Sequence, residues 1–259
     1  MPEYLTKLFN LRGKVAVVIG GGGHLCSAMA EGLARSGVKI ALVDKNDSNR
    51  TAVMRKIKRA CPSIIDLPMD VTNKQDHEAV LQAVLKRFKK VDILINGAGI
   101  NAPTPVMDIS LQEWHAIFDS HATATLFGCQ VFGAEMIKQR RGSIINLSSA
   151  SSGPPLSKAF TYSVAKAGVK NLTQNMAREW APYGVRVNAL RPGFFPTQWN
   201  MKHFIDAKRQ ADILGHTPMG RFGQPQELVG AVVWLASDSS SFVTGSEVHV
   251  DGGFTCMTI

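Results

Sequence analysis

Residues 15–26 read VAVVIGGGGHLC, an apolar run that passes directly into four glycines. Five consecutive apolar residues bounded by glycine predict a buried strand, and the residues after the glycines are expected to open a helix. Glycine permits positive φ and a close backbone approach, while the N-terminus of a helix offers unpaired N–H groups. A strand, a glycine turn and a helix in this order form a cradle for phosphate groups. The stretch therefore predicts a nucleotide-binding α/β unit near the start of the chain.

The rest of the chain repeats this alternation of strand and helix. Val80, Val84 and Phe88 recur at helical spacing and would share one buried face. Strands that are nearly continuous in Val, Ile and Leu are typical of a parallel sheet covered on both faces. The expected strands are residues 15–19, 39–43, 64–68, 92–95, 143–147, 186–190 and 247–250. We therefore predict a doubly wound α/β fold that binds ligands at the carboxyl ends of its strands.

Asp44 ends the second expected strand, twenty-four residues after Gly20. A carboxylate at this place accepts hydrogen bonds from the adenosine ribose hydroxyls and repels a 2′-phosphate. Its neighbour Lys45 would instead be a partner for a 2′-phosphate. We expect NAD as the cofactor, with NADP the less favoured alternative.

Length and composition favour a single domain spanning residues 1–259, because 259 residues with 45% hydrophobic content can bury one large core. Residues 194–222 are the expected irregular part, where prolines and glycines flank a helical segment at residues 201–214. This part directly follows Arg191-Pro192-Gly193 at a strand end. We interpret it as a lid over a site, and the alternative is a long surface connection.

Composition argues against several classes of protein. No apolar run approaches the roughly 18 residues of a membrane span, and the first residues lack the layout of a signal peptide. The four cysteines are scattered without a C-x-x-C pair, so we expect neither a metal site nor a disulfide framework. The net charge of +9 comes from dispersed basic residues with only 7% aromatic content, which favours a solvated surface over nucleic-acid binding. We expect a cytoplasmic protein with small-molecule partners, and neither nucleic acid nor membrane among them.

Tyr162 and Lys166 place a phenol and an ammonium four residues apart, on one face of a helix expected over residues 162–180. A nearby ammonium favours the phenolate and would lower the pKa of Tyr162 from about 10 toward working pH. Ser149, at the end of an apolar run, would hold the oxygen of a substrate. A lone Tyr–Lys pair is more often two surface neighbours, so the prediction of a proton-transfer site depends on its companions.

In joint order and spacing these motifs resemble the short-chain dehydrogenase/reductase family over nearly the whole chain. The matching pieces are Gly20 to Cys26, Asp70-Val71, Asn96-Gly97-Ala98-Gly99, Ser149, Tyr162 with Lys166, Pro192-Gly193 with Thr197, and Val250-Asp251-Gly252-Gly253. The resemblance implies a seven-stranded Rossmann sheet and an NAD(P)-dependent enzyme. The cofactor-binding residues that it implies are Gly20, Gly22, Gly23, His24, Leu25, Asp44, Asp70, Val71, Asn96, Ala98, Gly99, Tyr162, Lys166, Pro192, Gly193 and Thr197.

The resemblance also implies individual roles. Tyr162 would be the acid/base, Lys166 would hold the nicotinamide ribose and support the phenolate, and Ser149 would orient the reacting carbonyl. Asp70 would lie near the adenine, and Thr197 would meet the nicotinamide carboxamide.

The chain departs from the family pattern in two places. Ile19 stands where Thr is usual, and His24 and Cys26 replace the second and third glycines of the phosphate loop, so we expect an altered loop that still binds the cofactor. His121 takes the place of a helix asparagine that, in the family, helps fix a water joining the lysine to solvent. An imidazole would replace that relay, shift its pH optimum or pack elsewhere, and the three readings stay open. His121 therefore joins Ser149, Tyr162 and Lys166 in the predicted catalytic set.

Less specific similarities link residues 8–14, 192–198 and 216–223 to sugar-acid oxidoreductases of the mannonate, fructuronate or gluconate type. Polar side chains suited to a polyhydroxylated acid are Asn101, Gln198, Trp199 and Asn200, with Lys202 and Lys208 as carboxylate partners. The alternative is that the lysines merely cover an exposed helix.

The leading hypothesis is an oxidoreductase that moves a hydride between nicotinamide C4 and a secondary alcohol or ketone, with a sugar acid or other polyol as substrate. The competing hypothesis is a nucleotide-binding sensor or scaffold that kept the fold and lost catalysis, as Ile19, His24, Cys26 and His121 would suggest. The family often forms tetramers, so we expect a homotetramer built on the helix of Tyr162 and the carboxyl-terminal region. Apolar residues 232–235 and the tail 254–259 fit that interface, and they also fit an ordinary core.

Overall fold

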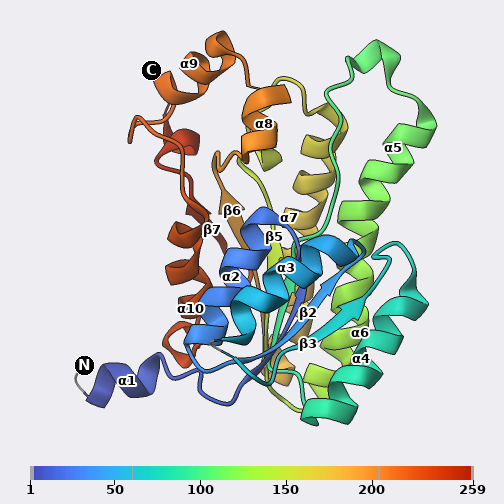
Figure 1. Ribbon diagram of the computed structural model, residues 1–259, viewed down its shortest axis with the longest axis vertical. Coiled ribbons are helices and arrows are strands. Elements are labelled where there is room, and N and C mark those ends of the chain that lie inside the picture. Colours follow the sequence, from blue (N-terminus) through green and yellow to red (C-terminus); the bar gives the residue numbers. More distant parts are fainter. Residues whose placement is uncertain (1–2, 60, 204, 258–259) are drawn as a thin grey trace.

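The computed structural model describes residues 3–59, 61–203 and 205–257, without the side chains of Gln198, Trp199 and His203. Its centre is a parallel seven-stranded sheet with the order β3-β2-β1-β4-β5-β6-β7 (Figure 1). The strands are β1 (Val15–Ile19), β2 (Lys39–Asp44), β3 (Ile65–Pro68), β4 (Ile93–Asn96), β5 (Gly142–Leu147), β6 (Val185–Pro192) and β7 (Glu247–Val250). Every expected strand is present, with small shifts at the ends, and the doubly wound α/β fold is confirmed.

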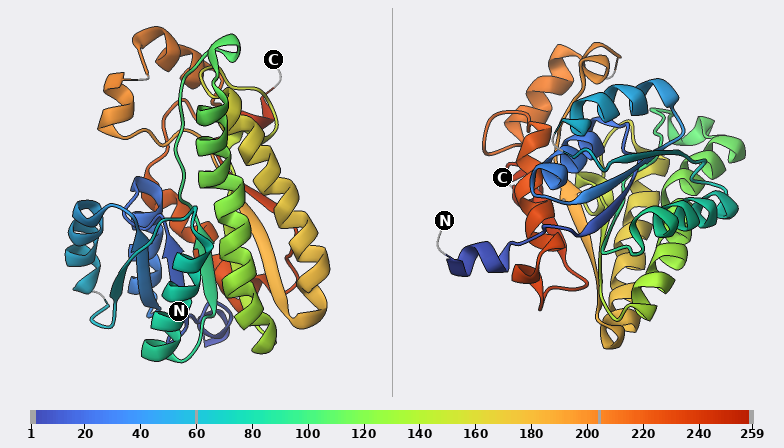
Figure 2. Two further views of the ribbon diagram at one scale, coloured as in Figure 1. Left: turned by 90° about the vertical axis from the view of Figure 1, so that its right-hand side faces the viewer. Right: turned by 60° about the horizontal axis from the view of Figure 1, so that its bottom comes forward.

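Helices cover both faces of the sheet. One face carries α2 (His24–Arg35), α3 (Asp47–Lys58) and α10 (Val229–Ala236), and the other carries α4 (Lys74–Phe88), α6 (Ala124–Lys138) and α7 (Phe160–Trp180). Figure 2 shows α6 and α7 side by side. The first strand explains the two layers, because Ala16 and Val18 belong to one core and Val15, Val17 and Ile19 to the other. Side chains of a strand alternate between faces, so a strand that is apolar throughout needs cover on both.

Polar residues define where several helices begin. Asn46, Asn73 and Ser110 each accept a hydrogen bond from a backbone N–H in the first turn of the helix that follows, which is α3, α4 or α5 (Leu111–Phe118). Such caps satisfy N–H groups that have no partner inside the helix. Further short helices are α1 (Glu3–Leu8), η1 (Val106–Asp108), η3 (Ala150–Ser152), η4 (Ala181–Tyr183), η5 (Pro225–Leu228), η6 (Asp238–Ser240) and η7 (Phe254–Cys256).

The segment expected as a lid, residues 194–222, lies beyond the carboxyl ends of the strands (Figure 1). One helix over residues 201–214 was expected there, and this prediction was wrong. The structure has two helices, α8 (Gln198–His203) and α9 (Ala207–Gly215). Asp206 separates them, because its backbone is extended and its side chain accepts a hydrogen bond from the Arg209 N–H at 2.8 Å. An aspartate in this conformation begins a new helix instead of continuing the old one.

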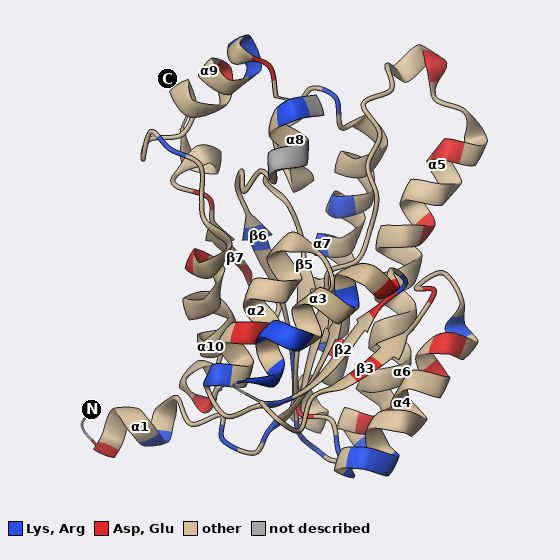
Figure 3. Ribbon diagram, viewed as in Figure 1, with Lys and Arg blue, Asp and Glu red and all other residues tan. Residues whose placement is uncertain are grey.

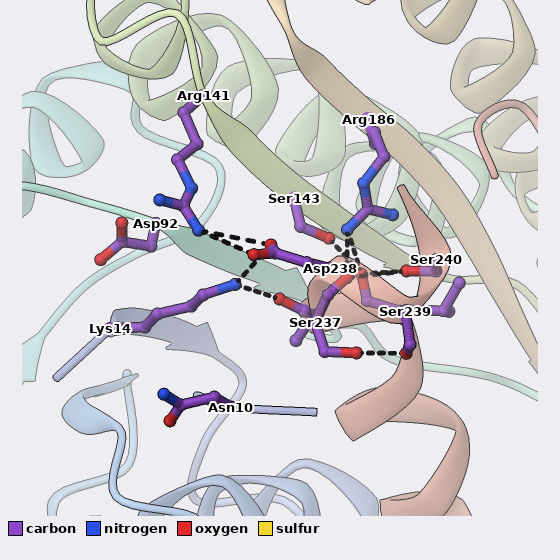
Figure 4. Close-up of polar contacts among 12 residues, drawn as sticks. Asn10, Lys14, Asp92, Arg141, Ser143, Arg186, Ser237, Asp238, Ser239 and Ser240 are labelled. Atoms are coloured by element: carbon purple, nitrogen blue, oxygen red, sulfur yellow. Dashed lines mark hydrogen bonds and ion pairs between the residues drawn. The ribbon is translucent and has the colours of Figure 1, made fainter. Parts of the chain in front are cut away.

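A polar cluster closes the opposite edge of the sheet (Figure 4). Lys14 Nζ donates to the carbonyl of Ala236 at 3.0 Å and pairs with Asp238, which Arg141 also contacts. Arg186 donates to the carbonyl of Leu235 at 2.6 Å. These carbonyls belong to the carboxyl end of α10, where cations are favoured by the helix dipole. The basic residues at this edge therefore hold the carboxyl end of α10 against the amino-terminal ends of the strands.

Charged residues of both signs are interspersed along the helices, as Figure 3 shows. The four cysteines are all free thiols. Within residues 3–59, 61–203 and 205–257, the helices are too short or too polar to traverse a lipid bilayer. Nor does this described part of the chain bring together three or more His, Cys, Asp or Glu side chains in an arrangement that would bind a metal ion.

Candidate active site

Two adjoining cavities lie at the carboxyl ends of the strands, where the fold predicts a ligand. One of about 560 Å³ extends from the glycine loop to the ends of β2 and β3, and one of about 350 Å³ reaches the start of α7. Both are lined by Gly20, Gly23, Gly97 and Gly99, so they form one elongated groove. The predicted site residues that line it are Gly20, Gly23, His24, Leu25, Asp44, Asp70, Val71, Ala98, Gly99, His121, Ser149, Tyr162, Lys166, Pro192, Gly193 and Thr197. Gly22 and Asn96 are not among the lining residues.

Glycine is required along the groove because of space. A Cβ atom on Gly20, where φ is +78°, would lie 2.7 Å from the backbone nitrogen of Ala98. The Gly22 N–H donates to Asp44 Oδ2 at 3.0 Å, which bends the loop onto the end of β2. The loop therefore presents an open backbone surface beside the N-terminus of α2, and this cradle fits the pyrophosphate of a dinucleotide.

The replaced glycines of the loop are accommodated in different ways. The Cys26 side chain is buried against Gly97, where an added Cβ atom would lie 2.2 Å from the sulfur. Burial raises the pKa of the Cys26 thiol to about 12, so it is a neutral packing group. His24 is exposed at the start of α2, and Ile19 is buried in the core. The departures thus change the lining of the loop while its backbone cradle persists.

Asp70 and Lys45 form the far end of the groove. Lys45 Nζ pairs with Asp70 Oδ2 at 2.8 Å, and the same carboxylate accepts hydrogen bonds from the backbone and hydroxyl of Thr72. These contacts hold the pKa of Asp70 down to about 2, so it is ionised at neutral pH. Lys45, the residue that follows Asp44 in the chain, therefore already forms an ion pair with the carboxylate of Asp70.

Thr197 lies at the other end of the groove, where it starts α8. Its hydroxyl donates to Asn200 Oδ1 at 2.7 Å, and the Asn200 N–H donates to the Thr197 hydroxyl at 3.0 Å. Both residues line the smaller cavity together with Pro192 and Gly193. The reciprocal bonds fix Thr197 at the point where the chain leaves β6 for the segment of residues 194–222.

Ser149, Tyr162 and Lys166 meet in the smaller cavity. Tyr162 and Lys166 come from the first turns of α7, which begins at Phe160, two residues before the expected start. Lys166 is only 4% exposed, and its Nζ donates to the carbonyl of Leu147 at 2.6 Å and lies 5.6 Å from the centre of the Tyr162 ring. Ser149 follows β5 and shares a hydrogen bond with Tyr162. The expected proximity of the three side chains is therefore found.

Lys166 was expected to lower the pKa of Tyr162, and this lowering is not found in the protein without its cofactor. Burial raises the pKa of Tyr162 above its ordinary value, and the hydrogen bond with Ser149 offsets only part of this shift. Burial also lowers the pKa of Lys166 to about 8. The simple expectation from the four-residue spacing was wrong because desolvation of the phenol is the largest influence on its pKa.

His121 points into the same cavity from a π-helical turn, η2 (Asp119–Thr123), between α5 and α6. Its Nε2 lies 2.8 Å from the carbonyl of Ile100, and because a carbonyl only accepts, Nε2 carries the proton. The ring stands edge to face against Tyr162, with 5.0 Å between ring centres. Nδ1 is buried without a hydrogen-bond partner among the described residues. Of the three readings, packing elsewhere is excluded by this position.

His121 also explains a glycine on the facing loop. A Cβ atom on Gly99, where φ is +151°, would lie 1.9 Å from Cε1 of the imidazole. Burial and the positive charge of Lys166 lower the pKa of His121 to about 3. The imidazole is therefore neutral throughout the physiological range and acts there only as a hydrogen-bonding group.

Replacing His121 with Asn is expected to leave the shape of the pH profile of kcat/KM unchanged between pH 5.5 and pH 7.5. A group with a pKa near 3 has already lost its proton in this window, so it contributes no limb. The measurement compares log kcat/KM for both proteins across the range. A limb near pH 6.5 that is present in the wild type and absent in the variant would show instead that His121 titrates during turnover.

Asn96 serves the core beneath the groove. Its Nδ2 donates to Asn146 Oδ1 at 2.8 Å, and Asn146 Nδ2 donates to the hydroxyl of Thr173 at 2.9 Å. The three side chains thereby connect β4, β5 and α7. Asn96 ends the fourth strand as expected, and its contacts are with this buried chain of amides.

An ion pair that was not expected holds the segment of Ser149. Arg191 of β6 pairs with Glu247 of β7 at 2.9 Å and donates to the carbonyl of Ala150 at 3.0 Å. Glu247 in turn accepts hydrogen bonds from the hydroxyls of Ser148 and Ser152 at 2.7 and 2.9 Å. We call these two charged residues the Arg191–Glu247 clamp. Its hydrogen bonds hold the chain on both sides of Ser149, at Ser148 before it and at Ala150 and Ser152 after it.

The sequence contained a partial indication of the clamp, since Arg191 and Glu247 are charges in otherwise apolar strands. Their pairing follows only from the β6–β7 register, in which Glu247 faces Ala189.

Lys202 and Lys208, the expected carboxylate partners, are exposed, and Lys208 pairs with Asp212. Gln198 and Trp199 have side chains outside the described part. Lys158 and Arg209, which line a further cavity, were missed.

The chain is similar to known proteins over nearly its whole length. A family model described as enoyl-(acyl carrier protein) reductase matches residues 24–255. The uncharacterized oxidoreductase UxuB of Bacillus subtilis is 40% identical over 95% of this chain and 96% of its own length. The NAD-dependent glycerol dehydrogenase of Listeria innocua is 33% identical over 96% of each chain.

A solved structure extends the comparison. The gluconate 5-dehydrogenase of Burkholderia cenocepacia, in complex with NADP and tartrate, superposes with a TM-score of 0.92. It is 32% identical in sequence, and the match covers 98% of this chain and 100% of the other. The groove therefore lies in a fold that holds a nicotinamide dinucleotide in a relative.

Proposed function

The chain belongs to the short-chain dehydrogenase/reductase family of NAD(P)-dependent oxidoreductases, and from this premise we propose that it oxidises a secondary alcohol of a sugar acid or polyol, or reduces the matching ketone. One observation carries the assignment of the site. Ser149, Tyr162 and Lys166 meet in a single cavity at the end of a groove shaped for a dinucleotide. The names of the glycerol and gluconate dehydrogenases above support a polyhydroxylated substrate.

Tyr162 and Ser149 handle the proton of the alcohol. In oxidation, the Tyr162 phenolate takes the hydroxyl proton while the Ser149 hydroxyl donates a hydrogen bond to the same oxygen; in reduction the proton returns from Tyr162. A bound nicotinamide supplies the acceptor or donor of the hydride. The ring of His121, packed edge to face with Tyr162, and the first turn of α7 keep the phenol directed into the cavity.

Lys166 assists Tyr162 through the hydrogen-bond donors of its ammonium group. An ammonium has three donors, and the carbonyl of Leu147 uses one of them, so two remain for the ribose and for the proton path. Burial lowers the pKa of Lys166 to about 8, so its side chain is still mostly an ammonium at neutral pH. The altered glycine loop raised the alternative of a scaffold without catalysis, but the convergence of all three proton-transfer residues favours the enzyme.

A panel of substrates tests this function. Gluconate, mannonate, their 5-keto and uronate counterparts, glycerol, threitol and xylitol are offered with NAD, NADH, NADP and NADPH, and the absorbance of the reduced nicotinamide is followed. We expect turnover with at least one sugar acid or polyol pair. Cofactor binding without turnover of any of these compounds would reject the proposal and favour the scaffold.

We propose NAD as the preferred cofactor, because Asp44 lines the groove while Lys45, the cation that lines the same cavity, is paired with Asp70. Replacing Asp44 with Asn keeps an acceptor for the Gly22 N–H and removes the charge that repels a 2′-phosphate. The ratio of kcat/KM with NADP to that with NAD is expected to rise about 10-fold or more. Lys45→Gln is the control and should not raise the ratio. A wild type that already prefers NADP would contradict the proposal.

We also propose a homotetramer assembled in part through α7. Phe160 and Val164 lie one turn apart on this helix and are 47% and 41% exposed, so they place two neighbouring apolar side chains at the surface, which fits an interface. Val232 and Leu235, considered for the interface, lie in the core. The free thiols fit the cytoplasm as the proposed location.

A further inference from the structure

A third cavity of about 340 Å³ adjoins the smaller cavity that Ser149, Tyr162 and Lys166 line. Gly193, Phe195 and Asn200 line both. The two charged residues among its lining are Lys158 and Arg209, and both are cations. No carboxylate lines this cavity or the neighbouring cavity of Tyr162, as far as the described residues show. The pair of cavities therefore carries a positive field next to the proposed site of hydride transfer.

Lys158 is held in an unusual backbone conformation. Its φ is +58°, in the left-handed region that residues with a side chain rarely adopt. Such conformations gather at ligand sites, where the surrounding structure imposes them. Asp206 is the carboxylate nearest to its ammonium, at 4.0 Å, and both side chains of this pair are largely exposed. The ammonium therefore keeps capacity for a second anion.

Arg209 brings the second cation from the lid helix α9. Its guanidinium donates to the hydroxyl of Ser157 at 2.8 Å and to the carbonyl of Ser157 at 2.9 Å. A guanidinium has five N–H donors, so these two bonds leave others for a ligand. Because Ser157 precedes Lys158 in the chain, the same contacts fix both cations on one wall of the cavity.

From this wall, and resting on the proposed function, we propose that Lys158 and Arg209 bind the carboxylate of a sugar acid while its secondary alcohol lies at Tyr162. A carboxylate matches a guanidinium and an ammonium through charge-assisted hydrogen bonds. Neutral polyols lack this contact. The enzyme is thus a sugar-acid dehydrogenase that discriminates against the neutral alcohol with the same hydroxyl pattern.

The test compares matched pairs of substrates, gluconate with glucitol and mannonate with mannitol. The wild type should have a higher kcat/KM for the acid of the pair that it oxidises. Arg209→Gln and Lys158→Gln should each lower the ratio of acid to neutral kcat/KM by about 10- to 100-fold. Lys138→Gln is the control and should leave the ratio unchanged, because this exposed lysine of α6 pairs with Glu135 and lines none of the three cavities. Thermal unfolding of the variants checks that each is folded.

The outcomes separate the subsite from the function. Equal kcat/KM for acid and neutral alcohol in the wild type, or an equal loss for both in Arg209→Gln, would overturn the subsite and leave the oxidoreductase in place. Turnover of neither member of either pair, with turnover of another polyol in the panel, would also overturn it. Absence of turnover with every compound would reject the proposed function itself.

Discussion

Replacing Tyr162 with Phe is expected to lower kcat/KM by about 10²- to 10⁴-fold, the usual contribution of a positioned acid or base. The substitution removes only the hydroxyl. The ring that stands 5.0 Å from His121 remains, and so does the packing at the start of α7. The loss should therefore appear in the chemical step, and the affinity for the cofactor should stay close to that of the wild type.

Steady-state kinetics and a fluorescence titration with reduced nicotinamide measure these two effects separately. Tyr183→Phe is the matched control, since Tyr183 lies in η4 and contacts Arg140, away from the groove. That variant should keep full activity. Near-normal turnover in Tyr162→Phe would reject Tyr162 as the acid/base, and loss of cofactor binding would reject a purely catalytic role.

Replacing Glu247 with Ala is expected to lower the free energy of unfolding by about 3–5 kcal/mol, as is typical when one partner of a buried ion pair is removed. Arg191 would be left buried without its carboxylate, and its Nε already lacks a partner among the described residues. The hydroxyls of Ser148 and Ser152 would lose their shared acceptor. The segment of Ser149 should loosen, so kcat should fall as well.

Urea unfolding followed by circular dichroism measures the stability, and kinetics at saturating substrate measure kcat. Asp212→Ala breaks an exposed pair with Lys208 and should cost less than about 1 kcal/mol. Glu247→Gln keeps an acceptor and should recover part of kcat. An equal effect of the Glu247 and Asp212 variants on stability would show that the clamp is not a buried pair in solution.

Lowering the pH should weaken the Arg191–Glu247 clamp. Burial alone would raise the pKa of Glu247, but the hydrogen bonds that this carboxylate accepts and the cations beside it hold its pKa below the ordinary 4.5. Because the folded pKa is the lower one, the stabilisation is present above the unfolded pKa and is lost as pH falls through the folded value.

The sheet was predictable because its signals are local. Each strand is a short apolar run, and β1 is buried on both faces for the reason that its composition suggests. The cavity residues were predictable because their spacing matches a family pattern, down to Tyr162 and Lys166 on one face of α7. Asn96 shows the limit of that reasoning, since it ends the expected strand and yet contacts Asn146 in the core.

Features that depend on three-dimensional neighbours were missed. The pKa of Tyr162 depends on burial, which spacing does not reveal. One continuous helix was expected over residues 201–214, whereas Asp206 begins a second helix. Lys158 and Arg209 are about fifty positions apart, and the contacts of Arg209 with Ser157 and of Asp206 with Lys158 bring them to one wall.

The Arg191–Glu247 clamp also bears on the order in which the molecule matures during synthesis. Strands β1 to β6 and every residue of the groove emerge from the ribosome before Glu247. The serines on either side of Ser149 therefore gain their shared acceptor only after β7 has been synthesised and has joined the sheet beside β6.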